Sequence, residues 1–597
     1  MSSVPERAEI ADDYKWDLAR VYANEGEWQA AYDAVEDRLA DLRSYEGRAL
    51  EDGETLLAAL ECRDEVMRQL ETVAAYARMR ADEDTRDQDH QAMETRARAL
   101  SSAASSAASF LEPAIQSLAP DELDAMIEGT DGLERYEHYL DDVHRLAPHT
   151  RSAEVEALLS DLGEVLSAPG EVYNLLTNAD MTFPAVEDPD GNAVEITQSN
   201  FTRLLKERDR DFRRTVHESF FEELADLRNT IGTTLGKSVR ADVKLAQVRD
   251  YETAREAAMD GPNVPVDVYD TVVDTVRDNL DVLHRHAELK RRALDVESLQ
   301  MWDLYMPVTA GEGPDVEYDE AVQHVIEAVA PLGEEYRTRV AEGVESSWID
   351  VYENRGKQSG AYSGGTYDTH PYVLMNYQDD LTDMFTLAHE LGHSMHSELA
   401  SGAQPYVYGD YSIFVAEVAS MVNEALLTHH LLDTVRDDHF RRHVLNEYVE
   451  RFRSTLYRQS MFAAFEHEIH TLSEDDVPLT PDRLDDTYGA LKSEFYAPAA
   501  FDDHIDREWM RIPHFYYNYY VYQYATGISA AAAIVTRVME EGASAAEDYL
   551  DALRLGSSAY PLEILETAGV DMRSAEPIEA AVAEYASALD QLEALLD

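Results

Sequence analysis

One helical segment, residues 387–394, constrains this chain more than any other feature because it contains the motif H-E-x-x-H. Residues four apart lie on the same face of an α-helix, so His389 and His393 can direct imidazole nitrogens at one point. Two such nitrogens are typical zinc ligands. Glu390 lies at the adjoining edge of that face, where its carboxylate can reach a metal-bound water without coordinating the metal. The segment is therefore predicted to be a helix that faces a third ligand.

The position of the third ligand separates the classes of zinc peptidase. The pattern H-E-x-x-H-x-x-G-x-x-H requires glycine at position 395 and histidine at 399, but this chain has Met395 and Leu399 there, which excludes that class. His396 follows His393 by only three residues and is better explained as a polar residue of the same helix.

Glu417, 24 residues after His393, is the better candidate for the third ligand. An apolar stripe at helical spacing accompanies it and predicts a mostly buried helix: Val415, Val418, Met421 and Val422. A carboxylate in such a helix is costly unless it is paired or bound to a metal. Glu424 lies two turns further along, near the same face. It either accepts a hydrogen bond from a ligand histidine or is an ordinary surface or salt-bridged glutamate.

The composition indicates the environment of the protein more than its function. A chain of 597 residues exceeds what one hydrophobic core usually serves, so two or more lobes are expected. Its formal net charge of -69 repels nucleic acid and anionic membranes, and we expect neither as a partner. Only seven lysines accompany 43 arginines, and 45% of the residues are hydrophobic. This combination is typical of a salt-adapted, halophilic cytosolic protein and not of a disordered acidic chain.

The single cysteine, Cys62, excludes an intrachain disulfide and any cysteine-rich zinc module. The N-terminus lacks a basic region followed by an apolar run, and no stretch of about 18 uncharged apolar residues occurs. The sequence therefore predicts a soluble, cytoplasmic protein.

Three regions are predicted along the chain: an N-terminal helical region (1–112), a second segment with a β-hairpin (113–200) and a catalytic domain (201–597). The Ser- and Ala-rich stretch 101–109 suits a closely packed helix better than a linker. The hairpin is expected around residues 181–197, where the turn signal 188–192 separates two short apolar runs. Two further strands are predicted at 348–352 and 371–377, on either side of the Gly-rich loop 356–365.

The Gly-rich loop precedes the motif helix and has two interpretations. A strand beside a zinc helix lets an extended peptide add to the sheet edge by backbone hydrogen bonds, and Gly364 and Gly365 would let that peptide come close. A purely structural hairpin explains the same pattern. The spacing excludes a phosphate-binding P-loop.

Residues 511–527 are unusually rich in tyrosine, with six tyrosines between positions 516 and 524. Attack of water on a peptide carbonyl creates an oxyanion, and Tyr or His donors such as His514 can stabilise it. Some of the six are expected to form an aromatic core instead.

Four features, taken together, resemble the oligoendopeptidase F branch of the thimet oligopeptidase family: the H-E-L-G-H motif, Glu417, the Gly-Gly-Thr sequence of the loop, and the His- and Tyr-rich residues 514–522. The resemblance implies a mainly α fold of two helical lobes around a deep central channel, with a small β-sheet beside the zinc-binding helix. It implies one Zn²⁺ held by His389, His393 and Glu417, and short peptides as substrates.

The same resemblance implies that His514, Tyr519 and Tyr522 contact the transition state or the substrate, and Tyr516 is a further candidate for substrate binding. The spacing from His514 to the tyrosines differs from that in thimet oligopeptidase itself. Which tyrosine takes which role therefore stays open.

The expected function is zinc-dependent hydrolysis of internal peptide bonds in short oligopeptides, with Glu390 as general base. Two alternatives remain. A carboxypeptidase or dipeptidyl carboxypeptidase would share these ligands and would need a cation for the substrate's C-terminal carboxylate, for which Lys357 and Arg355 are candidates. A non-catalytic peptide-binding protein with a structural zinc would gain nothing from Glu390. The oligomeric state is not predicted.

Overall fold

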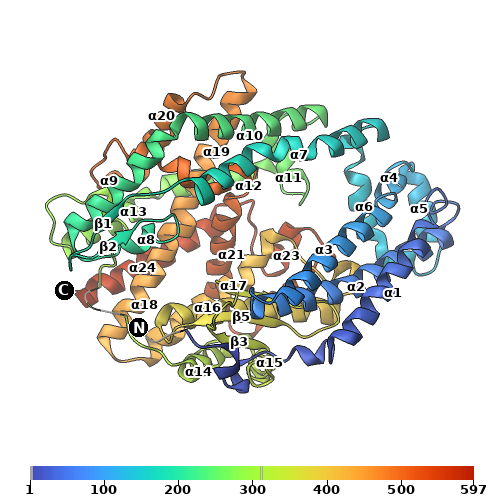
Figure 1. Ribbon diagram of the computed structural model, residues 1–597, viewed down its shortest axis with the longest axis horizontal. Helices are drawn as coiled ribbons and strands as arrows, with labels where there is room; N and C mark the ends of the chain where they lie inside the picture. The colour runs from blue at the N-terminus through green and yellow to red at the C-terminus, as the bar shows by residue number, and fades with distance from the viewer. Residues whose placement is uncertain (1–3, 310, 312, 597) are drawn as a thin grey trace. The chain divides into compact units, whose positions relative to one another are not determined.

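The computed structural model describes residues 4–309, 311 and 313–596 of the chain (Figure 1). Helices dominate it, and the β-strands of the described residues form two small sheets. The prediction of a mainly helical fold is therefore confirmed. The chain divides into two compact units, each assembled from three separate segments.

The first unit contains residues 1–148, 314–434 and 534–570. Asn24, Asp52 and Asp87 start its first three α-helices by accepting hydrogen bonds from backbone amides of the first turn. Buried side chains such as Leu39 and Val73 join these helices in one hydrophobic core. The helices of this unit are α1 (Glu25–Arg43), α2 (Gly53–Glu83), α3 (Gln88–Ala108), α4 (Leu111–Gln116), α5 (Pro120–Gly129), α6 (Glu137–Arg145), α14 (Tyr318–Ala328), α15 (Glu334–Glu345), α16 (Leu381–Ala403), α17 (Ile413–Thr434), α22 (Ala543–Arg554) and α23 (Pro561–Thr567).

The second unit contains residues 149–313, 435–533 and 571–597. Its hairpin joins β1 (Ala185–Glu187) to β2 (Ala193–Glu195), and Asp188 shapes the turn by accepting hydrogen bonds from the amides of Asp190 and Asn192. The predicted hairpin is confirmed. The helices are α7 (Ala153–Leu175), α8 (Phe201–Leu204), α9 (Arg210–Asp226), α10 (Arg228–Val248), α11 (Ala254–Asp260), α12 (Val266–Asp278), α13 (Leu280–Ala293), α18 (Asp438–Arg451), α19 (Arg458–Glu474), α20 (Pro481–Phe495), α24 (Glu576–Leu596) and the first part of α21 (Tyr522–Glu541).

The three-stranded sheet of the first unit has the order β3-β5-β4. The strands β3 (Ile349–Tyr352) and β5 (Tyr372–Tyr377) are parallel and lie where the sequence predicts them. The third strand, β4 (Tyr362–Gly364), was not predicted, because its residues belong to the segment interpreted as a Gly-rich loop. It pairs antiparallel with β5 and forms one edge of the sheet.

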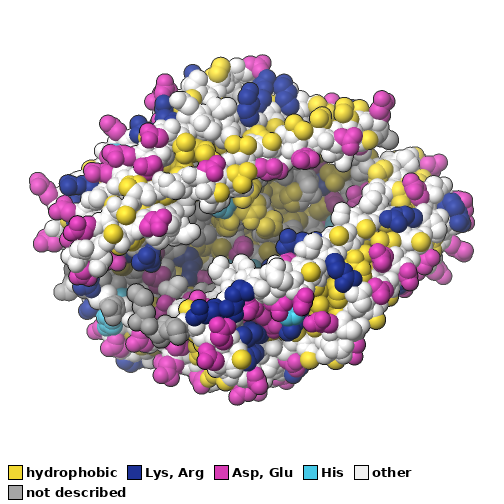
Figure 2. Space-filling view, in the orientation of Figure 1, with side chains coloured by type: hydrophobic (Ala, Val, Ile, Leu, Met, Phe, Trp, Pro, Cys, Tyr) yellow, Lys and Arg dark blue, Asp and Glu magenta, His cyan; other side chains and the backbone are white. Residues whose placement is uncertain are grey.

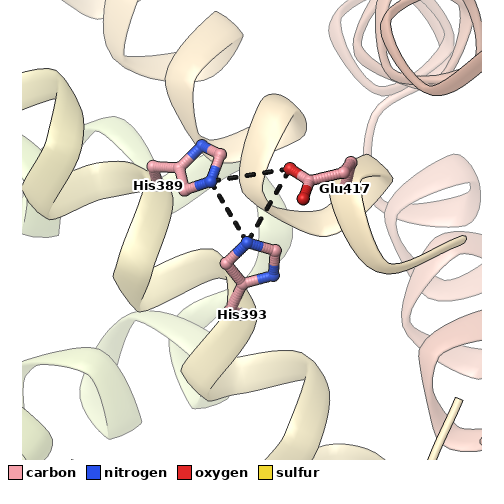
Figure 3. Close-up of side chains that lie close together, drawn as sticks. All are labelled: His389, His393 and Glu417. Carbon is pink, nitrogen blue, oxygen red and sulfur yellow. Dashed lines mark hydrogen bonds and ion pairs between the residues drawn. The ribbon is translucent and has the colours of Figure 1, made fainter. Parts of the chain in front are cut away.

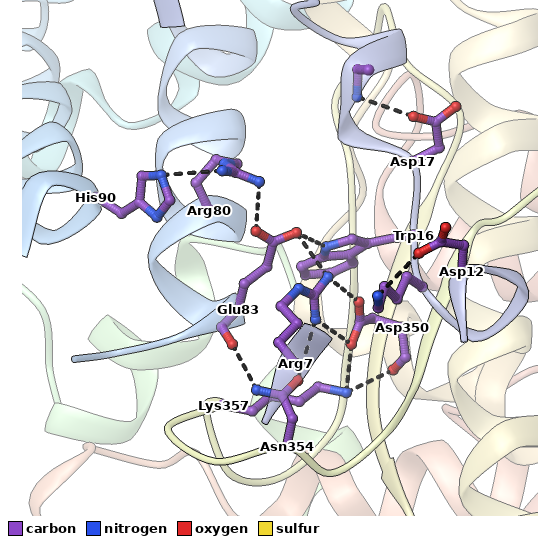
Figure 4. Close-up of polar contacts among 12 residues, drawn as sticks. Arg7, Asp12, Trp16, Asp17, Arg80, Glu83, His90, Asp350, Asn354 and Lys357 are labelled. Carbon is purple, nitrogen blue, oxygen red and sulfur yellow. Dashed lines mark hydrogen bonds and ion pairs between the residues drawn. The ribbon is translucent and has the colours of Figure 1, made fainter. Parts of the chain in front are cut away.

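A buried ion cluster fixes β3 to the N-terminal part of the first unit (Figure 4). Arg7 binds Asp350 at 2.6 Å and Glu83 at 2.8 Å, and Lys357 binds the other Asp350 oxygen at 2.7 Å. The ammonium of Lys357 also donates to the carbonyls of Asp350 and Tyr352, and its side chain is fully buried. Lys357 is therefore fully engaged in holding the sheet.

The compact units cut across the three regions predicted along the sequence. The boundary predicted after residue 112 lies inside the first unit, and the one after residue 200 lies inside the second. The division of the chain into regions 1–112, 113–200 and 201–597 stays a prediction. The compact units are built from segments that are distant in sequence.

Acidic side chains are scattered over the visible face of the molecule (Figure 2). This agrees with the composition, and it shows charge distributed over many elements instead of gathered in one patch. Among the described helices, none combines the length and the apolar character needed to cross a membrane.

Candidate active site

Helix α16 places both motif histidines on the face that it turns toward α17 (Figure 3). Their Nε2 atoms lie 3.1 Å apart. Glu417, on α17, directs Oε2 at the same point, 3.6 Å from His389 Nε2 and 3.8 Å from His393 Nε2. The structure thus brings together the three ligands that the sequence predicts.

Gly392 permits this close approach of the two helices. A Cβ atom at Gly392 would lie 2.6 Å from the Cα of Ser420 and 2.7 Å from the carbonyl oxygen of Ala419, both of which are backbone atoms. Glycine is therefore required by packing at the centre of the motif. The sequence alone does not reveal this role, because the role depends on how near the partner helix lies.

The three ligand atoms fit a tetrahedral zinc ion. They lie within 4.8 Å of one another. Zinc bonds of roughly 2.0–2.2 Å in a tetrahedral site separate ligand atoms by about 3.3–3.6 Å, and the observed distances bracket this value. An ion held by two imidazoles and one carboxylate would keep a fourth position for water, as catalytic zinc sites do.

Glu424 lies against His389, which favours one of the two interpretations of this residue. Its Oε1 is 2.5 Å from His389 Nδ1, and its side chain is largely buried. Burial alone would lower the pKa of His389, but the hydrogen bond and the charge of Glu424 outweigh it and raise that pKa. A carboxylate on Nδ1 directs Nε2 at the ligand point.

His393 and Glu390 are also affected by burial. Burial, and secondarily the charge of His389, lowers the pKa of His393 to about 4, so its ring is neutral at pH 7 and able to bind a metal. Burial raises the pKa of Glu390 to about 7, and the charge of Glu417 adds to this effect while His389 opposes it. A carboxylate with a pKa near neutrality is suited to accept and return a proton.

His396 is not part of the ligand group. It is buried, it stacks on Tyr411 with ring centroids 3.5 Å apart, and burial lowers its pKa to about 3. The structure agrees with its interpretation as a residue of the helix and not a ligand.

A hollow of about 1380 Å³ lies in the first unit beside the edge strand β4. Gly364 and Gly365 line it, together with Ser397, one turn beyond His393 on α16. The three ligand residues and Glu390 are not among the lining residues, so the hollow adjoins the ligand group without containing it. It offers an edge strand and two glycines to an extended ligand.

His514 and the tyrosines lie in the second unit. The 3-10 helix Pro513–Tyr516 presents His514, whose pKa is lowered by burial and then by the charge of Arg458. Its Nε2 lies 3.4 Å from the hydroxyl of Tyr524, and Tyr520 stacks near the ring. Tyr524 is not among the site residues predicted from the sequence, and its place in the tyrosine-rich segment was the available signal.

The three tyrosines named from the sequence occupy different surroundings. Tyr519 and Tyr522 are buried against the ring of Tyr269, at centroid distances of 5.5 and 5.1 Å. The Tyr516 hydroxyl lies 2.8 Å from that of Thr234. Their predicted roles in catalysis and substrate binding stay predictions.

The family model described as Peptidase family M3 matches residues 203–584, which is more than half of the chain. The chain belongs to peptidase family M3. A second model, described as Oligopeptidase F, matches residues 115–183. Peptidases of this family are metallopeptidases, so the chain hydrolyses peptides with the help of a metal, and the resemblance stated from the sequence is confirmed.

Curated relatives and solved structures of this family match along nearly the whole chain. Oligopeptidase PepF of Bacillus subtilis is 41% identical over 596 residues, which covers 100% of this chain and 89% of that protein. Group B oligopeptidase PepB of Streptococcus agalactiae is 38% identical and covers 99% and 98%. The crystal structure of oligoendopeptidase-F from Enterococcus faecium is similar with a TM-score of 0.75, at 37% identity over 96% of this chain and 99% of that one.

Proposed function

We propose that this family M3 peptidase is a zinc-dependent oligoendopeptidase that cleaves internal bonds of short peptides with Glu390 as general base. The observation that carries the proposal is the convergence of His389, His393 and Glu417 beside a buried glutamate of raised pKa. The names of the relatives, oligopeptidase and oligoendopeptidase, support the substrate class.

Five residues of the first unit have defined roles in this proposal. His389, His393 and Glu417 would hold the ion, which supplies Lewis acidity and a water acidic enough to ionise near neutral pH. Glu390 accepts the proton of the attacking water and returns it to the leaving amine. Glu424 keeps His389 oriented by holding its Nδ1.

The substrate would bind as an extended strand. Among the described residues, no strand pairs with the outer side of the edge strand β4, and Gly364 and Gly365 line the adjoining hollow. An extended peptide can therefore add to the sheet by backbone hydrogen bonds, which are independent of side-chain sequence. Short unstructured peptides suit this mode of binding better than folded proteins.

His514 and a tyrosine are proposed to donate hydrogen bonds to the oxyanion. The contact of Tyr524 with His514 makes Tyr524 the first choice. Tyr519 and Tyr522 are weaker candidates than Tyr524, because they are only 2% and 1% exposed and are therefore less accessible to a substrate.

The two alternative functions have less support. Lys357, one of the two cations suggested for a C-terminal carboxylate, is buried and bound to Asp350, and Arg355 pairs with Glu6 at 3.1 Å. A structural zinc in a non-catalytic protein would leave the buried, protonatable Glu390 unexplained.

Product mapping tests the proposal. A peptide blocked at both ends is incubated with the enzyme, and its fragments are identified by mass spectrometry. Internal cuts are expected, whereas release of C-terminal residues only, or no cleavage, would contradict endopeptidase activity. Metal analysis of Glu417→Ala tests the ligand set, and an unchanged zinc affinity would contradict the role of Glu417.

A further inference from the structure

A chain of hydrogen bonds connects the edge strand β4 to the helix of the general base. Ser394, on α16, is fully buried, and its Oγ lies 2.9 Å from the carbonyl oxygen of Glu390. Its Oγ also lies 2.8 Å from the Oγ of Ser363, the central residue of β4. In addition, the backbone of Ser363 interacts with the Glu390 carboxylate and opposes the rise in its pKa.

The direction of these bonds follows from the number of protons. A serine hydroxyl has one proton, and a carbonyl oxygen can only accept. The proton of Ser394 is therefore used on the Glu390 carbonyl, so Ser363 must donate its own proton to Ser394. The order of donation runs from the strand to the helix, and neither hydroxyl can be replaced by an apolar group without breaking it.

The alternation of side chains along β4 makes Ser363 the residue that faces α16. Successive residues of a strand point to opposite faces. Tyr362 donates its hydroxyl proton to Asp82 of α2 at 2.7 Å, on the opposite face from Ser363. Gly364 has no side chain. Ser363 is thus the residue of β4 whose side chain reaches the helix of the base.

We propose that Ser363, acting through Ser394, is a positioning residue that fixes the edge strand at a set distance from the Glu390 carboxylate. This inference rests on the proposed function, because a strand that binds the peptide must hold its scissile carbonyl where Glu390 delivers the attacking water. A displacement of about 1 Å in such a geometry is costly to catalysis. Backbone pairing of the peptide with β4 does not itself need either hydroxyl.

The positioning role predicts a specific kinetic pattern. Loss of one hydrogen bond is worth about a three- to tenfold change in rate. Ser363→Ala is expected to lower kcat by this factor and to leave KM within about twofold, because uniform binding of the peptide backbone is retained. Ser363→Thr keeps the hydroxyl and should recover most of the activity.

A double-mutant cycle tests the connection. Ser363→Ala, Ser394→Ala and the double variant are compared by kcat, KM, zinc content and thermal unfolding. Ser529→Ala serves as the matched control, since Ser529 is also buried and donates to the carbonyl four residues earlier, but within α21. We expect the double variant to be no slower than the slower single variant, with zinc content unchanged and kcat of the control close to wild type.

Several results would overturn the inference. Independent, multiplicative effects of the two alanine variants would contradict a chain through both hydroxyls, and so would a kcat of Ser363→Ala within twofold of wild type. Failure of Ser363→Thr to recover kcat would also contradict it. The proposed function is tested separately by Glu390→Gln. If Glu390→Gln loses activity and Ser363→Ala does not, the role of Glu390 stands and only the positioning role of Ser363 is refuted.

Discussion

The contact between Glu424 and His389 gives a quantitative prediction for metal affinity. Glu424 is 6% exposed and lies 2.5 Å from His389 Nδ1, so the hydrogen bond is short, buried and charge-assisted. Partners of this kind typically change metal affinity by about 10- to 100-fold. Glu424→Gln keeps an accepting oxygen but removes the charge, so we expect about tenfold weaker zinc binding. Glu424→Ala removes both and should weaken binding by about 100-fold, or about 2.7 kcal/mol.

Competition with a chromogenic chelator measures these affinities directly and does not depend on turnover. Glu398→Gln is a suitable control, because Glu398 is a partly buried carboxylate of α16, the helix of His389, and pairs with Arg339 instead of a histidine. The control should bind zinc as tightly as the wild type. An affinity of Glu424→Ala within threefold of wild type would refute the argument that Glu424 orients and strengthens the ligand.

Three other predictions concern packing, the ion cluster and the second unit. Gly392→Ala places a methyl group 2.6 Å from the backbone of α17, so we expect about 1–3 kcal/mol lower stability in urea unfolding together with weaker zinc binding; unchanged values would contradict the close approach. Asp350→Asn leaves Lys357 buried without its countercharge and should cost about 3–5 kcal/mol at pH 7. Burial alone would raise the pKa of Asp350, but its bonds to Arg7 and Lys357 outweigh burial and hold that pKa below the ordinary value. This stability is therefore present above about pH 4 and is lost as the pH falls through the folded pKa. The difference from wild type should shrink in acid, and a constant difference would contradict the assignment. Tyr524→Phe should lower kcat by about 100-fold or more if its hydroxyl binds the oxyanion, and a larger effect of Tyr519→Phe would favour that tyrosine.

The convergence of His389, His393 and Glu417 could be predicted because these residues obey local rules. The spacing of His389 and His393 fixes their common helix face, and the apolar stripe around Glu417 predicts a buried helix whatever lies beside it. Similarly, the hairpin at Asp188 and the strands at 348–352 and 371–377 follow from turn chemistry and residue alternation over short distances. Such features need no knowledge of the rest of the fold.

The features that could not be predicted all depend on tertiary contacts. The need for Gly392 arises from the backbone of α17, and the role of Ser363 arises from Ser394, 31 residues away. Strand β4 has only three residues and depends on pairing with β5. Its local sequence alone therefore could not be distinguished from that of a loop. The burial of Lys357 against Asp350 likewise depends on tertiary structure, and it removes Lys357 as a candidate for binding a substrate carboxylate.

The alternation of the two units along the chain could not be predicted for the same reason, because it depends on tertiary contacts. A boundary read along the chain assumes that neighbouring segments pack together. Here each unit takes three segments from distant parts of the sequence. The predicted salt adaptation depends on composition and stays a prediction, as does the predicted cytoplasmic location.

Turnover by Glu390→Gln tests the central claim most directly. The substitution keeps the size of the side chain and removes its ability to take a proton, while His389, His393 and Glu417 are untouched. Zinc content and cleavage of an internally quenched peptide are measured on the same preparation, in high salt. We predict wild-type zinc content with cleavage reduced by at least about 100-fold. Substantial cleavage by the zinc-loaded variant would contradict the role of Glu390 as general base.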